Sequence, residues 1–87
     1  MKIPDNFVLR NIIGEYIIVP VGQFATEFNG IISTNSTGAF LWDLLTREDL
    51  SEEELVEKML DEYDTDEPNA REDVRLFVSE LKRVGII

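Results

Sequence analysis

Cysteine and histidine are both absent from this chain of 87 residues. Without cysteine there is no disulfide framework and no thiolate metal site. Without histidine the chain lacks the commonest metal ligand and the usual general base near neutral pH. Glycine is sparse too, and neither Gly30 nor Gly38 belongs to a glycine-rich phosphate loop. We therefore expect a protein that is not an enzyme and that holds neither a cofactor nor a metal ion.

Long apolar runs are also missing. No stretch approaches the roughly 18 apolar residues of a membrane span, and no apolar core of a signal peptide follows the N-terminal charge. These absences predict a cytoplasmic protein with no membrane partner. The composition is nevertheless that of a folded chain, since 44% of the residues are hydrophobic. We expect one domain, residues 1–87.

Basic residues are scarce, and the acidic ones are concentrated. The chain has 8 Lys and Arg against 18 Asp and Glu, which gives a net charge of -10. Segment 48–67 contains Lys58 as its one basic residue among many Asp and Glu, so it carries the imbalance. Such a segment is typical of a solvated helix face. It is a poor match for a phosphate backbone, so we expect no nucleic-acid partner.

Three short β-like stretches come first. Residues 7–12 are apolar with some alternation, and residues 16–21 are rich in β-branched and aromatic side chains. Gly14 marks a turn between them, and Pro20 belongs near an edge or a strand end because it cannot donate to a ladder. Asn29-Gly30 is a strong hairpin signal that leads into a third strand over residues 31–34.

Three helices are predicted after the strands. The first begins at Asn35 or Ser36, and the second begins with the capping box of Ser51 and Glu54. The third begins near Asp66 and stops at Gly85. The core positions expected on the first two helices are Phe40, Leu41, Leu44 and Leu45, then Leu55, Met59, Leu60 and Tyr63.

The third helix has a core stripe with two different edges. A helical wheel places Asp73 and Glu80 on one edge and leaves Leu76 outside the stripe, either as an isolated surface residue or as part of a second contact face. The other edge is basic, and it is either ordinary charge beside a core or a positive lip along an apolar groove. The basic residues are Arg71, Arg75 and Lys82. The core stripe is Ala70, Val74, Phe77, Val78, Leu81 and Val84.

The order of three strands followed by three helices predicts an α+β domain. We expect a three-stranded antiparallel sheet packed on the helices, in a winged helix-turn-helix-like arrangement. Two surfaces could then bind a partner. One is the third helix, acting as a DNA recognition helix. The other is the third strand, whose free backbone groups could pair with an added peptide strand if it lies at the edge.

Much of the chain resembles the PqqD-like family, small proteins related to the D component of pyrroloquinoline quinone biosynthesis. The Asn-x-Thr-Gly-x-x-x-Trp pattern from Asn35 to Trp42 is the most specific part of the resemblance. The matching segments are residues 14–22, 28–32, 34–45 and 55–64, followed by residues 73–74, 77–78, 81 and 85–86. Gly38 is expected to permit close packing, and Trp42 to lie in the core and not to touch a bound peptide.

The resemblance implies a recognition element for ribosomally made, post-translationally modified peptides. Such proteins bind the leader segment of a precursor peptide and present the peptide to a modifying enzyme, often a radical SAM enzyme with an iron–sulfur cluster. The leader docks as an extra strand beside the third strand and the third helix. Carried onto this sequence, the peptide-binding residues are Ile31, Ile32, Ser33, Thr34, Arg71, Val74, Arg75, Val78 and Lys82.

Two alternative functions stay open on the sequence. A winged-helix regulator would bind duplex DNA, although the net charge of -10 opposes it. A docking subunit of an enzyme complex would use Leu76 and the acidic second helix as its contact face, and this role is compatible with leader binding.

Overall fold

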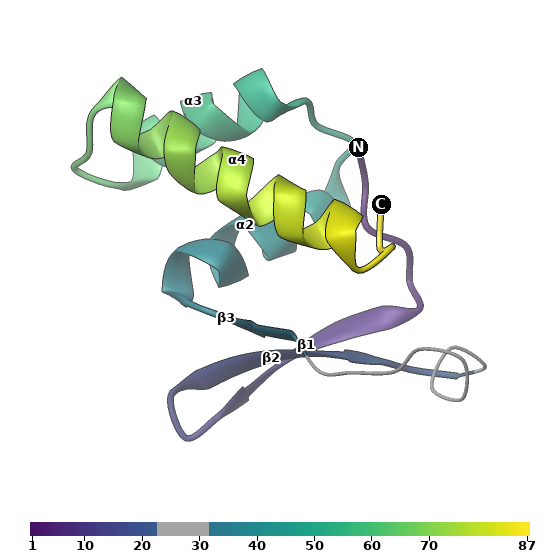
Figure 1. Cartoon of the computed structure of the whole chain (residues 1–87). Helices are drawn as coiled ribbons and strands as arrows, with labels where there is room; N and C mark the ends of the chain where they lie inside the picture. Colours follow the sequence, from purple (N-terminus) through teal and green to yellow (C-terminus); the bar gives the residue numbers. More distant parts are fainter. Residues whose placement is uncertain (23–31) are drawn as a thin grey trace.

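The computed structural model describes residues 1–22 and 32–87 of the chain. Within these residues a three-stranded antiparallel sheet of order β1-β2-β3 precedes three helices. The strands are β1 (Phe7–Ile12), β2 (Glu15–Pro20) and β3 (Ile32–Thr34), and the helices are α2 (Ser36–Arg47), α3 (Glu52–Glu62) and α4 (Glu67–Arg83). The helices gather on one side of the sheet (Figure 1). The predicted α+β class and the order of strands and helices are confirmed.

A two-residue turn joins β1 to β2. Its residues Ile13 and Gly14 both have left-handed backbones, with φ of 51° and 81°, as a type I′ hairpin turn requires. The Gly14 amide donates to the Asn11 side chain at 3.2 Å. The predicted turn is confirmed, and Pro20 ends β2 as expected. The predicted Asn29-Gly30 hairpin lies outside the described residues.

Side-chain caps fix where the helices begin. Asn35 caps α2 by accepting from the Gly38 amide at 2.8 Å. Ser51 and Glu54 form the predicted capping box of α3, and Asp66 caps α4 by accepting from the Asn69 amide at 2.9 Å. Gly85 follows α4 with a φ of 84°. These boundaries agree with those predicted from the sequence, because each depends on interactions between residues a few positions apart.

One core lies between the sheet and the helices. Trp42 is 3% exposed within it, as expected. The predicted stripe of α3 is wrong at one position, because Leu60 is 37% exposed and Val56 is buried instead. A helix that packs through Leu55 and Met59 also buries residue 56 beside them, and residue 60 then faces outward. In the described part of the chain, no helix is long and apolar enough to cross a membrane.

Candidate functional site

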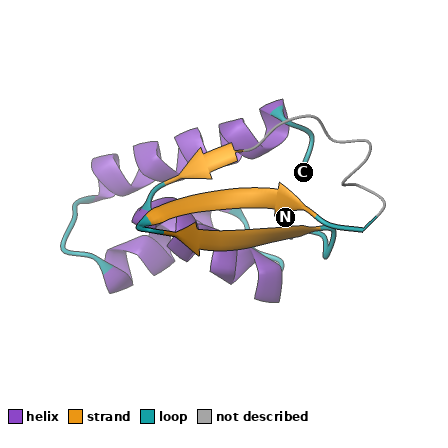
Figure 2. Cartoon of the chain, turned by 90° about the horizontal axis from the view of Figure 1, so that it is seen from below, coloured by secondary structure: helices purple, strands orange, loops and turns teal. Residues whose placement is uncertain are grey.

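The strand β3 lies at one edge of the sheet, with β1 at the other (Figure 2). The two-residue turn makes Ile12 and Glu15 a hydrogen-bonded pair, and hydrogen-bonded and non-hydrogen-bonded pairs then alternate along the ladder. Tyr16 and Ile18 therefore direct their backbone groups toward β3, where they oppose Thr34 and Ile32. Ser33 lies between those two residues, so its backbone N–H and C=O point away from β2. The sheet thus offers a donor and an acceptor at Ser33 for a further strand.

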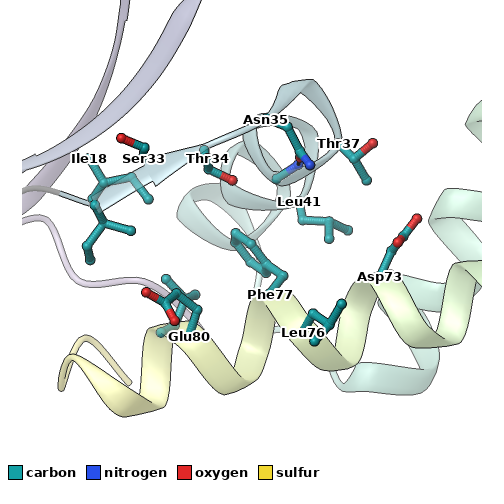
Figure 3. A pocket seen from close by; sticks show the side chains of 13 residues that line it. Ile18, Ser33, Thr34, Asn35, Thr37, Leu41, Asp73, Leu76, Phe77 and Glu80 are labelled. Atoms are coloured by element: carbon teal, nitrogen blue, oxygen red, sulfur yellow. Dashed lines mark hydrogen bonds between the residues drawn. The ribbon is translucent and has the colours of Figure 1, made fainter.

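A pocket of about 250 Å³ lies between β3 and α4. Its floor is apolar and comes from three parts of the fold, the sheet, α2 and α4. Figure 3 shows β3 and the start of α2 on one side of the pocket and α4 on the other. The floor residues are Ile18, Ile32, Leu41, Phe77 and Leu81, which are all buried. An extended segment beside β3 would lie over an apolar surface.

The junction of β3 and α2 closes one side of the pocket. Asn35, Thr37 and Gly38 line it there. A Cβ atom built on Gly38 would lie 1.8 Å from Thr34 Oγ1 and 3.1 Å from Thr34 Cβ. The helix therefore approaches the strand more closely than any other residue at this position would permit. This contact confirms the packing role expected for Gly38, and it fixes β3 beside the pocket.

The α4 side of the pocket combines an apolar centre with acidic ends. Leu76 is 53% exposed and lines the pocket beside Phe77. Asp73 and Glu80 lie at the two ends, Asp73 toward Thr37 and Glu80 toward Ser33 (Figure 3). Both carboxylates belong to the edge of α4 that is opposite to its basic edge.

The two carboxylates differ in their partners. Glu80 accepts hydrogen bonds from the Arg83 guanidinium at 3.0 and 2.5 Å. Those hydrogen bonds lower the pKa of the Glu80 carboxyl from its ordinary value, although burial acts in the opposite direction. Asp73 is exposed, and its carboxylate makes no hydrogen bond or ion pair with any residue in the described ranges 1–22 and 32–87. Its charge is therefore free for a ligand.

The structure brings the strand half of the predicted site together. Ile32, Ser33 and Thr34 all line the pocket. Ile32 is buried, Ser33 is exposed and Thr34 is half-buried, which is the alternation of a strand with one face on the core. Ile31 lies outside the described residues.

The structure does not bring the predicted helix residues to this pocket. Val74 and Val78 are 1% and 2% exposed and belong to the core. Arg71 forms ion pairs with Glu53 of α3 and with Glu67, so its guanidinium lies on the α3 side of α4. Arg75 pairs with Glu72 at 2.6 Å, and Lys82 is exposed. None of these five residues lines the pocket, so the expected basic lip is replaced there by an acidic one.

This difference has a physical reason. A helical wheel separates the two edges of a core stripe, but it does not say which edge faces a particular strand. In the fold, Arg71 of the basic edge contacts Glu53 of α3. Asp73 and Glu80 of the acidic edge instead line the pocket beside β3. The signal available in the sequence was Leu76, an apolar residue outside the core stripe and between two acidic ones. Of its two interpretations, the contact face is the one that agrees with its place in the pocket lining.

The chemistry of this site is that of binding. Backbone groups at Ser33, an apolar floor and two carboxylates can hold an extended peptide. Among the described residues that line the pocket, no nucleophile is paired with a base. Across residues 1–22 and 32–87, no group of three His, Cys, Asp or Glu side chains could hold a metal ion. The site therefore suggests recognition of a polypeptide.

Two solved structures share this fold. One is TbiB1 in complex with the TbiA(β) leader peptide, with a TM-score of 0.72 and 27% identity, covering 99% of this chain and 93% of that one. The other is lasso peptide synthetase B1 complexed with the leader peptide, with a TM-score of 0.70 and 16% identity, covering 98% of this chain and 93% of that one. The second likeness, at its low identity, concerns the fold alone.

The sequence comparisons give one family and no curated relative. No curated protein matches the chain. The family model for coenzyme PQQ synthesis protein D (PqqD) matches residues 15–87, which include β2, β3 and all three described helices. With the β3 edge and its pocket inside the matched range, this chain belongs to the PqqD family.

Proposed function

We propose that this protein binds the leader segment of a ribosomally synthesised precursor peptide and presents the peptide to a modifying enzyme. The observation that carries the proposal is the free edge of β3 above an apolar pocket, in the fold that TbiB1 uses to hold a leader peptide. Membership of the PqqD family supports it. The enzyme partner is a peptide-modifying enzyme, and the family resemblance points to the radical SAM class.

The leader binds by adding a strand to β3. Its backbone pairs with the N–H and C=O of Ser33, which β2 leaves unused. Alternate side chains of the added strand then point toward the helices and enter the pocket between β3 and α4. Main-chain hydrogen bonds give affinity in this arrangement, and the pocket gives specificity.

This role assigns no chemical step to the chain itself. The protein is a binding partner, and the catalytic groups belong to the enzyme that receives the peptide. The site contains no histidine or cysteine that could act as base or nucleophile.

An NMR titration of the isotopically labelled protein tests the proposal. The probes are the leader peptide of the precursor encoded beside this gene and, in a separate sample, a short DNA duplex. We expect saturable amide shifts at Ile32 to Thr34 and at Leu76 to Glu80 with the peptide only. Shifts with DNA only, or with neither probe, would contradict leader binding.

The variant Ser33→Pro tests strand addition itself. Proline removes the outward N–H of Ser33 and leaves the β2–β3 hydrogen bonds in place, as proline at a sheet edge permits. We expect peptide affinity to fall roughly tenfold, because one main-chain hydrogen bond is lost and the hydrogen bond beside it is weakened. Ser33→Thr keeps the N–H and serves as the matched control. Equal affinity of the two variants would show that the leader binds without pairing to β3.

DNA binding is not favoured by the structure. Arg71, Arg75 and Arg83 of α4 are each held in ion pairs by glutamates. Phosphate contacts would have to displace those partners, in a protein whose net charge is -10.

A further inference from the structure

The pocket between β3 and α4, together with the free edge of β3, forms a groove for an extended peptide. Along the α4 side of this groove, acidic residues flank apolar ones. Asp73 and Glu80 stand at its ends, and Leu76 and Phe77 lie between them (Figure 3). Since Asp73 and Glu80 are seven positions apart in one helix, their Cα atoms are about 10 Å apart along the helix axis. A separation of seven residues is close to two full turns, so both side chains lie on the same face of α4.

This spacing can be compared with that of an extended peptide. Side chains on one face of a strand repeat every second residue, or about 6.6 Å, so positions i, i+2 and i+4 span about 13 Å. The peptide positions are therefore slightly farther apart than the two carboxylates of α4. The side chains of lysine and arginine are long and flexible enough to reach inward over this difference in spacing. A central apolar residue would then lie over Leu76 and Phe77, with a basic residue two positions away on each side.

The charges on the protein side favour this arrangement. Asp73 has no partner among the described residues and is exposed, whereas Glu80 is shared with Arg83. Among residues 1–22 and 32–87, no basic side chain lines the groove. An acidic residue of the peptide would therefore meet a carboxylate at either end, unpaired at Asp73 and paired with Arg83 at Glu80, and a basic one would meet a partner at both.

We propose that the groove selects leader segments of the pattern cation-x-apolar-x-cation, where the cation is lysine or arginine. This inference rests on the proposed function and specifies its ligand. Asp73 and Glu80 are the residues that determine the charge preference, and Asp73 has the larger effect because Glu80 is already paired. Leu76 and Phe77 receive the apolar side chain.

Selection from a display library of short random peptides tests this proposal. We expect sequences selected on the wild-type protein to share an apolar residue with lysine or arginine at both second neighbours. Asp73→Asn should weaken the best of these peptides by roughly 2- to 5-fold, and Glu80→Gln should weaken it less. Fluorescence anisotropy with the labelled peptide measures both affinities, and raising the salt concentration should reduce the difference between wild type and variants.

A charge reversal makes the test specific. When peptides are selected on the Asp73→Lys variant, one of the two basic positions of the peptide should change to aspartate or glutamate. The position that changes shows in which direction the added strand runs. The control variant carries Glu57→Gln and Asp61→Asn, two exposed residues of α3 away from the groove. It changes the net charge by two units and should select the same peptides as the wild type.

The outcomes separate this inference from the proposed function. Selected peptides that shift the β3 amides but lack the basic positions would overturn the charge pattern and leave leader binding intact. An equal loss of affinity in the α3 control and the Asp73 variant would also overturn it, since net charge would then be the cause. A failure to select any peptide that shifts the β3 amides would overturn both.

Discussion

At the scale of single residues, Ile13 shows a conflict between side chain and backbone. Its φ is 51°, a left-handed conformation that costs a residue with a Cβ about 1–2 kcal/mol and is rarer still for a β-branched one. No packing offsets that cost, because Ile13 is 98% exposed. The type I′ turn needs this conformation, which asparagine, aspartate or glycine adopts more readily than isoleucine.

Replacing Ile13 with asparagine should therefore stabilise the protein. Ile13→Asn creates the Asn-Gly pair preferred in such turns, and we expect the free energy of unfolding to rise by about 1 kcal/mol. Urea denaturation followed by circular dichroism measures the change. The control is Ile13→Val, which keeps a β-branched residue at the same φ and should leave stability unchanged. An asparagine variant no more stable than the valine variant would show that the turn is not strained.

At the scale of elements, the contact between β3 and α2 depends on Gly38. Its amide is held by the Asn35 cap, and its missing side chain lets Thr34 pack against the helix. The end of β3 and the first turn of α2 are thereby locked together at the side of the pocket. A change here affects the fold and the site at once.

The variant Gly38→Ala measures how tight that contact is. Alanine is better than glycine in a helix by about 1 kcal/mol, but overpacking against Thr34 costs about 1–3 kcal/mol. We expect a net loss of unfolding free energy in urea denaturation and weaker binding of the leader peptide. In the background Thr34→Ala, which removes the Oγ1 atom, the same change should cost less. A stabilising effect in both backgrounds would mean that the contact is loose.

A second element-scale contact joins α3 to α4. The Arg71 guanidinium bridges Glu53 of α3 and Glu67 of its own helix. Hydrogen bonding and charge from Arg71 hold the pKa of the Glu53 carboxyl below its ordinary value of 4.5. The contribution of Glu53 to stability is therefore present above pH 4.5 and is lost as the pH falls through the folded pKa.

Arg71→Gln should lower the unfolding midpoint slightly at pH 7 and have less effect in acid. The pair is exposed, so the decrease is small. As the pH falls through the lowered folded pKa of Glu53, the pairing is lost in the wild type too, so the difference between the two proteins should shrink. Thermal unfolding at pH 7 and pH 3 checks this. A difference between the two proteins that grows in acid would contradict the proposed pairing.

These elements also show what the sequence could predict and what it could not. The turn at Gly14 and the caps at Asn35, Ser51 and Asp66 were predictable, because each is decided by residues within a few positions. The edge of α4 that borders β3 was not, because it depends on how two distant elements pack. Arg71 and Asp73 are two residues apart, yet one contacts α3 and the other lines the pocket.

At the scale of the whole molecule, the net charge determines which ligands are attracted from a distance. The net charge is -10, and residues 48–67, which contain α3, account for all of it because the charges of the other residues cancel. A field of this size attracts cationic ligands from a distance and weakens as salt is added. The acidic ends of the groove and the net charge of the whole molecule therefore favour the same kind of peptide.

The rate of association should show this effect. For a peptide with the cation-x-apolar-x-cation pattern, we expect the association rate constant to fall by about tenfold between low and physiological salt, with a smaller change in the dissociation rate. Stopped-flow fluorescence measures both. A matched peptide with glutamine at the two basic positions should associate at a rate nearly independent of salt. An association rate that rises with salt for the basic peptide would contradict electrostatic attraction.

The free edge of β3 has one more consequence. An unpaired edge accepts any compatible strand, and the edge of a second copy of this protein is one such strand. Each copy has a net charge of -10, so two copies repel each other at the distance that edge pairing requires. A basic peptide experiences the opposite force. The acidity of the molecule thus discourages self-pairing into a continuous sheet while it keeps the same edge open to a peptide of opposite charge.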